Sequence, residues 1–147
     1  MARKFVCVTM MLLLCACIQH AFALGSGRPL VAGTLVEVTK ETQAKLGLNF
    51  TLVAERVDAE AVLVSLEIPR TGKLKNLRSV KMRIGSGRPL VSASLQTTPG
   101  KNGSWIVSFQ LSPELADKCS IDLIGPYEGL SYYIYAIAVK GYVTARK

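Results

Sequence analysis

Residues 77–84, LRSVKMRI, decide the fold class of this chain, because apolar and polar side chains alternate along them. Val80, Met82 and Ile84 stand at every second position, and a serine, a lysine and an arginine precede them. Successive side chains of a β-strand point to opposite faces, so this period predicts a strand with one buried and one solvated face. The same alternation recurs on both sides of this stretch and favours an all-β protein.

This alternation predicts eight strands, and most of the segments between them contain glycine, proline or asparagine. The expected strands cover residues 30–39, 49–55, 61–68, 77–84, 90–97, 105–111, 119–124 and 131–143. Two short helical turns are expected at 40–46 and 113–118, after Thr39 and Ser112 at N-cap positions. Short strands separated by turns are typical of β-sandwiches. We therefore expect an antiparallel β-sandwich of about seven or eight strands, immunoglobulin-like in general architecture.

Residues 98–104, TPGKNGS, are rich in turn-forming residues and predict a hairpin between the strands at 90–97 and 105–111. Alternation also places individual side chains. It predicts that Val91 and Tyr133 lie on the buried faces of their strands.

The first 23 residues have the three regions of a secretory signal peptide. A basic head precedes an apolar run at 5–18, and small residues at positions 21 and 23 predict cleavage after Ala23. The apolar run is shorter than the roughly 20 residues that a transmembrane helix needs. We therefore expect a secreted or periplasmic mature chain, residues 24–147, without a transmembrane span.

Residues 14–17, LCAC, suggest a second way for this leader to end. The segment resembles a bacterial lipobox, with a leucine three residues before Cys17 and a small residue directly before it. Cys15 departs from the usual pattern. The alternative expectation is a lipid-anchored envelope protein that is modified at Cys17.

Residues 25–31, GSGRPLV, recur identically as residues 85–91. Four expected strands follow each copy, so an internal duplication of the single domain, with halves starting near residues 25 and 85, explains the repeat. In a functional interpretation, Arg28 and Arg88 stand in glycine loops whose N–H groups hold an anion. In a structural interpretation, the glycines and the proline form the start of an edge strand.

Loss of the leader also removes His20, the only histidine, and leaves Cys119 as the only cysteine. Catalysis by Ser-His-Asp or Cys-His groups and histidine-ligated metal sites are then excluded. We expect no catalytic, cofactor-binding or metal-binding residues, and a buried Cys119 thiol. The enzymatic alternative is a small hydrolase that uses paired carboxylates such as Asp58 and Glu60.

The chain has a net charge of +8, and no acidic residue lies between Glu67 and Glu114. Seven basic residues of this interval form a candidate patch for an anionic ligand: Arg70, Lys73, Lys75, Arg78, Lys81, Arg83 and Arg88. No aromatic residue lies among residues 70–88 to stack on bases, so nucleic acid is not an expected partner. The alternative is that these charges only solvate outward faces.

The sequence therefore favours an exported, non-catalytic β-domain that binds a protein or glycan of the extracellular or periplasmic space, or serves in cell-envelope structure. Two alternatives stay open. One is the small carboxylate-dependent hydrolase, and the other is an electrostatic binder of an anionic polysaccharide or envelope polymer.

Overall fold

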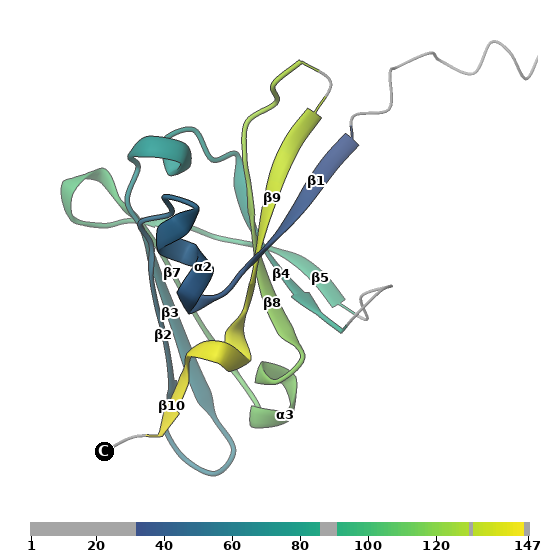
Figure 1. Ribbon diagram of the computed structural model, residues 1–147. Helices are drawn as coiled ribbons and strands as arrows, with labels where there is room; N and C mark the ends of the chain where they lie inside the picture. Colours follow the sequence, from purple (N-terminus) through teal and green to yellow (C-terminus); the bar gives the residue numbers. More distant parts are fainter. Residues whose placement is uncertain (1–31, 86–90, 130, 146–147) are drawn as a thin grey trace, which may run out of the picture. The chain divides into compact units, whose positions relative to one another are not determined.

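The computed structural model describes residues 32–85, 91–129 and 131–145, which fold into two five-stranded sheets (Figure 1). Sheet A contains, from edge to edge, β1 (Ala32–Val38), β9 (Ser131–Ala138), β8 (Cys119–Ile124), β4 (Ser79–Ile84) and β5 (Val91–Leu95). Sheet B contains β10 (Val143–Ala145), β2 (Thr51–Arg56), β3 (Val62–Ile68), β7 (Trp105–Leu111) and β6 (Thr98–Pro99). Neither sheet closes into a barrel. The prediction of a mostly β protein is confirmed.

Both predicted helical turns are present, as α2 (Lys40–Lys45) and α3 (Pro113–Ala116). The Thr39 hydroxyl accepts a hydrogen bond from the Thr42 N–H at 3.3 Å, and the Thr42 hydroxyl accepts one from the Thr39 N–H at 2.9 Å. This reciprocal capping satisfies two N–H groups at the start of α2. Three 3₁₀ turns also occur in the described part: η1 (Gly72–Leu74), η2 (Lys101–Gly103) and η3 (Val139–Tyr142).

The prediction that all strands are antiparallel is wrong for two pairs. β1 runs parallel to β9, and β10 runs parallel to β2. Each of these pairs joins segments that are distant in the sequence, so no hairpin determines their direction. Side chains alternate in the same way in parallel and antiparallel strands, so the sequence pattern cannot distinguish the two.

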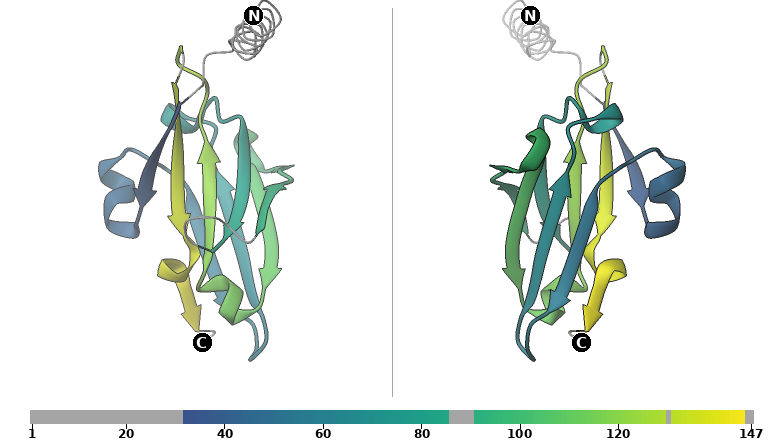
Figure 2. Two further views of the ribbon diagram at one scale, coloured as in Figure 1. Left: turned by 90° about the vertical axis from the view of Figure 1, so that its right-hand side faces the viewer. Right: turned by 90° about the vertical axis from the view of Figure 1, so that its left-hand side faces the viewer.

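The described chain has ten strands, two more than expected. β6 has only two residues, too few for a recognisable alternation. The expected strand at 131–143 instead divides, because the chain leaves sheet A after Ala138, passes through η3 and enters sheet B at Val143, where β10 begins (Figure 2).

The hairpin predicted between 90–97 and 105–111 is also wrong. This segment does contain a turn, at residues 100–104, but the turn connects β6 to β7 within sheet B. β5 pairs with β4 in sheet A instead. The chain therefore changes sheet between Leu95 and Thr98, a step that turn-forming residues do not reveal.

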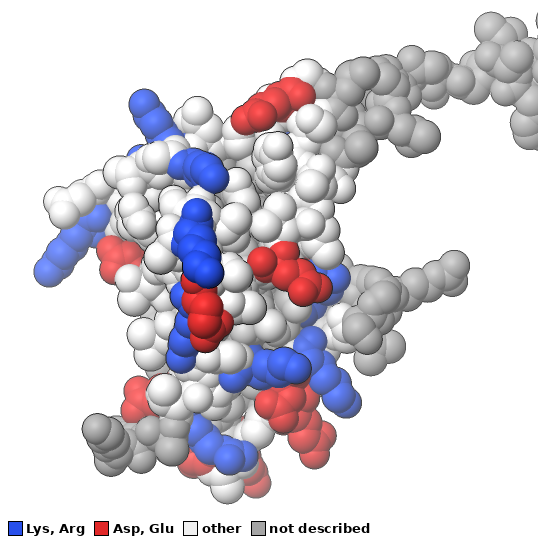
Figure 3. Space-filling model, in the orientation of Figure 1, with Lys and Arg blue, Asp and Glu red and all other residues white. Residues whose placement is uncertain are grey.

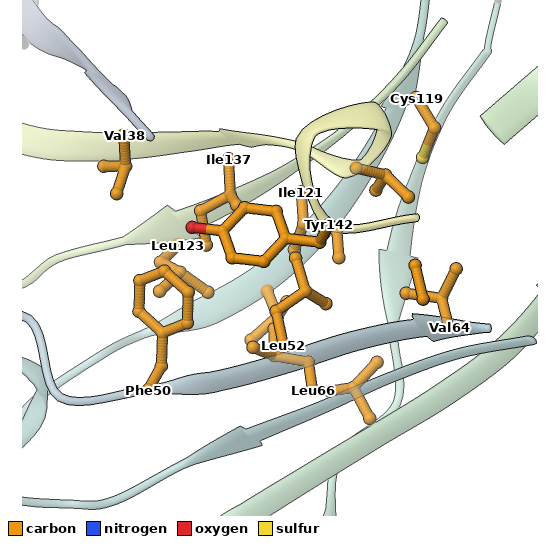
Figure 4. Packing of buried hydrophobic residues seen from close by; sticks show 14 of the residues in the cluster. Val38, Phe50, Leu52, Val64, Leu66, Cys119, Ile121, Leu123, Ile137 and Tyr142 are labelled. Atoms are coloured by element: carbon orange, nitrogen blue, oxygen red, sulfur yellow. The ribbon is translucent and has the colours of Figure 1, made fainter. Parts of the chain in front are cut away.

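Side chains from both sheets belong to one buried apolar cluster (Figure 4). Val64 and Leu66 of β3 are fully buried, as are Ile121 of β8 and Ile137 of β9. Burying a side chain of this size contributes about 1.5–3 kcal/mol relative to leaving it exposed. Cys119 lies in the same cluster and is 2% exposed, so the predicted buried thiol is confirmed.

Two side chains expected in the core are exposed instead. Val91 is 45% exposed because it begins β5, an edge strand with one neighbour. Tyr133 is 44% exposed near the start of β9, where its ring stacks on Tyr135 with the centroids 6.3 Å apart. Alternation gives the direction of a side chain, whereas its burial depends on what covers it.

The two GSGRPLV copies lie almost entirely outside the described residues, so duplication stays a prediction. The strands that follow them, β1 and β5, form the two opposite edges of sheet A. β1 pairs in parallel with β9, whereas β5 pairs antiparallel with β4.

The leader predictions, cleavage after Ala23 and lipidation at Cys17, also concern residues outside the described ranges. Within those ranges, no helix is long and apolar enough to cross a membrane.

Candidate anionic-ligand surface

The structure separates the predicted basic patch into two groups. Arg70, Lys73, Lys75 and Arg78 lie on the segment between β3 and β4, residues 69–78, which we call the basic loop. The second group, Lys81 and Arg83, lies on β4, on the face of sheet A that points away from the apolar cluster. Arg88 lies outside the described residues.

The basic loop crosses from sheet B to sheet A. At its start, Ile68 of β3 pairs with Trp105, the first residue of β7. At its end, Ser79 of β4 pairs with Ile124, the last residue of β8. The loop, with η1 inside it, therefore lies at the end of the sheets where β7 begins and β8 ends (Figure 1).

Arg70 lies over an aromatic ring on the sheet B side of the basic loop. Its guanidinium carbon is 4.1 Å from the centre of the Trp105 ring, because the pairing of Ile68 with Trp105 brings the following residues over the indole. The Arg70 Nε donates a hydrogen bond to the Lys75 carbonyl at 2.7 Å. An exposed cation–π contact contributes about 0.5–1 kcal/mol, so the ring and the hydrogen bond together favour this orientation of Arg70.

Arg78 makes the equivalent contact on the sheet A side. Its guanidinium carbon is 4.0 Å from the centre of the Tyr127 ring, which meets Tyr132 edge to face with the centroids 5.4 Å apart. The Arg78 N–H donates to the Ile124 carbonyl at 2.8 Å and continues the pairing of β4 with β8. Tyr127 is 52% exposed, so this contact lies at the surface.

Positive charge exceeds negative charge at this end of the molecule. Lys73 donates from Nζ to the Leu46 carbonyl at 2.9 Å, which ties the basic loop to the segment after α2. Lys75 and Lys101 are exposed, and Lys101 comes from η2. Two acidic residues lie at this end: Glu67, which accepts a hydrogen bond from the Ser104 hydroxyl at 3.0 Å, and Glu128, which is exposed and directly follows Tyr127. Figure 3 shows several basic and fewer acidic side chains at this end, and mixed charges at the opposite end.

The aromatic partners of both arginines were not predicted. No aromatic residue lies within 70–88, and Trp105 and Tyr127 are distant from this segment in the sequence. Only the pairing of β3 with β7 and of β4 with β8 brings them to the basic loop. No local sequence signal predicts these contacts.

Arg83, in the second group, binds Asp122 on the outer face of sheet A. The two side chains form a bidentate pair, with Nε at 3.0 Å from Oδ2 and the second nitrogen at 3.1 Å from Oδ1. Asp122 is only 9% exposed as a consequence. Arg83 is thus already paired with a carboxylate, whereas no ion pair of Arg70 or Arg78 with a carboxylate occurs among the described residues.

A hollow of about 710 Å³ lies on the same face of sheet A. The small residues Ser120, Ala136 and Ala138 line it together with longer side chains. Its charged lining residues are Glu37, Arg83, Asp117, Lys118 and Lys140. The hollow therefore presents charges of both signs and does not favour one class of ion.

The carboxylate pair Asp58 and Glu60 has a structural role. Asp58 Oδ1 accepts the Glu60 N–H at 2.8 Å in the turn between β2 and β3. Glu37 and Asp117 are the two carboxylates that line the hollow. No group of three or more His, Cys, Asp or Glu side chains that could hold a metal ion occurs among the residues with defined positions.

Cys119 is not placed to act as a nucleophile. Its Sγ lies in the apolar cluster, and burial, followed by the charge of Asp122, raises the pKa of the thiol to about 11. The thiolate is the reactive form of cysteine, so the Cys119 side chain is protonated and inert at neutral pH.

Two mixed β-sheets with a shared core define a mostly β protein, and basic side chains outnumber acidic ones at the end that carries the basic loop. Comparison of the chain with protein families, curated proteins and solved structures found no match.

Proposed function

We propose that this chain is an exported, non-catalytic β-sandwich domain, immunoglobulin-like in general architecture, that binds an anionic polysaccharide or envelope polymer through the basic loop. The signal-like leader supports export, and one apolar cluster shared by two sheets supports a sandwich. The observation that carries the proposal is the pair of arginines, Arg70 and Arg78, each held over an aromatic ring at one end of the molecule.

Arginines that pack on aromatic rings in this way can bind carboxylate and sulfate groups. A guanidinium group donates two parallel hydrogen bonds to two oxygens of one anionic group, and this paired interaction is stronger than a neutral hydrogen bond. Because Trp105 and Tyr127 already restrict the two side chains, less conformational freedom is lost on binding. Lys75, exposed between them in the sequence, adds longer-range attraction.

The same contacts argue against nucleic acid as the ligand. Single-stranded nucleic acids bind to aromatic side chains whose faces are open to bases. One face of Trp105 and one face of Tyr127 are covered by arginine. The basic loop therefore supplies charge rather than a stacking surface.

The decisive experiment measures binding to heparin and alginate at several salt concentrations. We expect Arg70→Gln with Arg78→Gln to weaken binding about tenfold or more, since each hydrogen bond to a charged group is worth about 1.5–3 kcal/mol. The matched control is Lys118→Gln with Lys140→Gln, which removes the same charge from the hollow. Equal losses of affinity in both variants would show that binding depends only on the net charge of the protein. An unchanged affinity in the arginine variant would refute the proposal.

A carboxylate-dependent hydrolase is the second candidate, because Glu37 and Asp117 line one hollow. Glycosidases need two carboxylates on either side of the bond that they cleave. Hydrolysis of a polysaccharide that disappears in both Glu37→Gln and Asp117→Asn would favour this function over the binding domain.

A further inference from the structure

One edge of sheet A is open to pairing. β5 pairs with β4 on one side, and nothing in the described residues pairs with its other side. An edge strand of this kind presents a row of free N–H and C=O groups, which can pair with a strand of another molecule. The first residue of β5, Val91, is also 45% exposed.

β5 lacks the sequence features, such as proline, charge or very short length, that hinder pairing at the other sheet edges. Its sequence, VSASL, contains no charged residue and no proline. In sheet B, β6 has two residues, one of them Pro99, and β10 has three. The other edge of sheet A, β1, carries Glu37. Proline, charge and shortness are the usual means of blocking edge pairing, so β5 is the least protected edge of the described fold.

We propose that a second copy of this chain docks on β5, antiparallel and around a twofold axis at Ala93. In this register Val91 faces Leu95 of the second copy, and Ser92 faces Ser94 of the second copy. Apolar side chains thus meet apolar side chains, and hydroxyl groups meet hydroxyl groups. A twofold interface must be self-complementary, and the VSASL sequence meets this condition around its central residue.

The charges next to β5 permit this pairing. Lys81 is opposite Ser94, and Arg83 is opposite Ser92. In the dimer, Lys81 of one copy and Arg83 of the second copy lie in one row across the strands. They are separated by three strand spacings, or about 14 Å. This separation exceeds the screening length of about 8 Å at physiological ionic strength. Arg83 is also neutralised by Asp122, so repulsion across the new interface is small.

Five residues form a small interface, so we expect a reversible dimer that is populated at high protein concentration. Two double variants test it in sedimentation experiments on protein produced from the full coding sequence. Ser92→Lys with Ser94→Lys, and separately Ser92→Glu with Ser94→Glu, place like charges directly opposite each other across the twofold axis. Each variant should be monomeric, and an equimolar mixture of the two should restore a dimer.

The matched control is Thr51→Lys with Gln110→Lys, which adds the same charge on exposed positions of sheet B and should leave the dimer intact. Thermal melting of each variant shows that it is folded. A wild type that is monomeric at its highest soluble concentration would overturn the proposal. A dimer that survives both charge variants, or folded variants that do not associate when mixed, would overturn it too.

A cysteine at position 93 tests the register. Ala93 faces its own counterpart across the axis, so Ala93→Cys should form an interchain disulfide under mild oxidation, whereas Ser92→Cys alone should not. Cross-linking of Ser92→Cys in place of Ala93→Cys would overturn this arrangement.

Discussion

Arg83 binds Asp122 although Lys81 is the residue directly opposite Asp122 on the neighbouring strand. Arg83 is itself opposite Ser120 and reaches Asp122 diagonally across β4 and β8. A guanidinium group matches a carboxylate with two hydrogen bonds, whereas a lysine offers a single charged centre. Geometry therefore decides the partner, and the side chain of Asp122 is only 13% exposed as a result.

Removal of this carboxylate should destabilise the fold. We expect Asp122→Ala to lower the free energy of unfolding by about 1–3 kcal/mol, because it leaves Arg83 partly buried without its partner. Urea denaturation measures the effect. Asp117→Ala, at an exposed position after α3, should cost less than about 0.5 kcal/mol. Equal effects of both changes would show that the ion pair does not stabilise the fold.

Two leucines of β3 differ in burial. Leu66 is fully buried and Leu63 is 44% exposed on the opposite face. Leu66→Ala should cost about 2–5 kcal/mol of unfolding free energy, whereas Leu63→Ala should cost less than about 1 kcal/mol. Chemical denaturation of the two variants checks the difference. Similar losses of unfolding free energy in the two variants would contradict the assignment of the Leu66 face of β3 to the core.

The raised pKa of Cys119 should make the protein less stable in alkaline solution. The folded thiol titrates at a pKa of about 11, against 9.0 for a free thiol, so the unfolded chain releases its proton first as pH rises. Stability is therefore complete below about pH 9 and falls towards pH 11, by at most about 1.4 kcal/mol per pH unit. Denaturation of the wild type and of Cys119→Ala at several pH values measures this contribution.

Burial also raises the pKa values of Tyr135 and Tyr142, so part of the alkaline slope should persist in Cys119→Ala. An unchanged slope in that variant would contradict the buried-thiol prediction. Rapid labelling of native Cys119 by a thiol reagent at neutral pH would contradict it independently.

The leader prediction has a direct measurement. Intact-mass analysis of the exported protein should show a chain that starts at Leu24. A lipid-modified chain that starts at Cys17 would establish the anchored alternative instead.

Sequence alternation located most strands closely, because a half-buried strand must change polarity at every residue. The strand expected at 105–111 is β7 (Trp105–Leu111), and the strand expected at 61–68 is β3 (Val62–Ile68). Alternation describes a strand by itself and carries no information about its neighbours. The parallel direction of β1 and the transfer of the chain into β10 depend on those neighbours and were missed.

For the candidate site too, the sequence predicted local features but not contacts between distant residues. The sequence indicated that Arg70 and Arg78 belong to a basic segment, because composition is local. It could not indicate that Trp105 and Tyr127 contact them, since this depends on how β3 pairs with β7 in sheet B and β4 pairs with β8 in sheet A. Asp122 is similar, because its burial depends on a diagonal contact from β4.

The parallel pairing of β1 with β9 has a mechanical consequence. The chain enters β1 at one end of sheet A and leaves β9 at the other, where η3 leads to β10 (Figure 2). Tension applied before β1 and after β10 therefore pulls these two strands along their length in opposite directions. The seven register pairs from Ala32 to Val38 are loaded in shear and must yield together instead of opening one by one. Resistance to pulling depends on the rate of unfolding and not on the equilibrium stability. In this fold we expect it to depend on the pairing of β1 with β9.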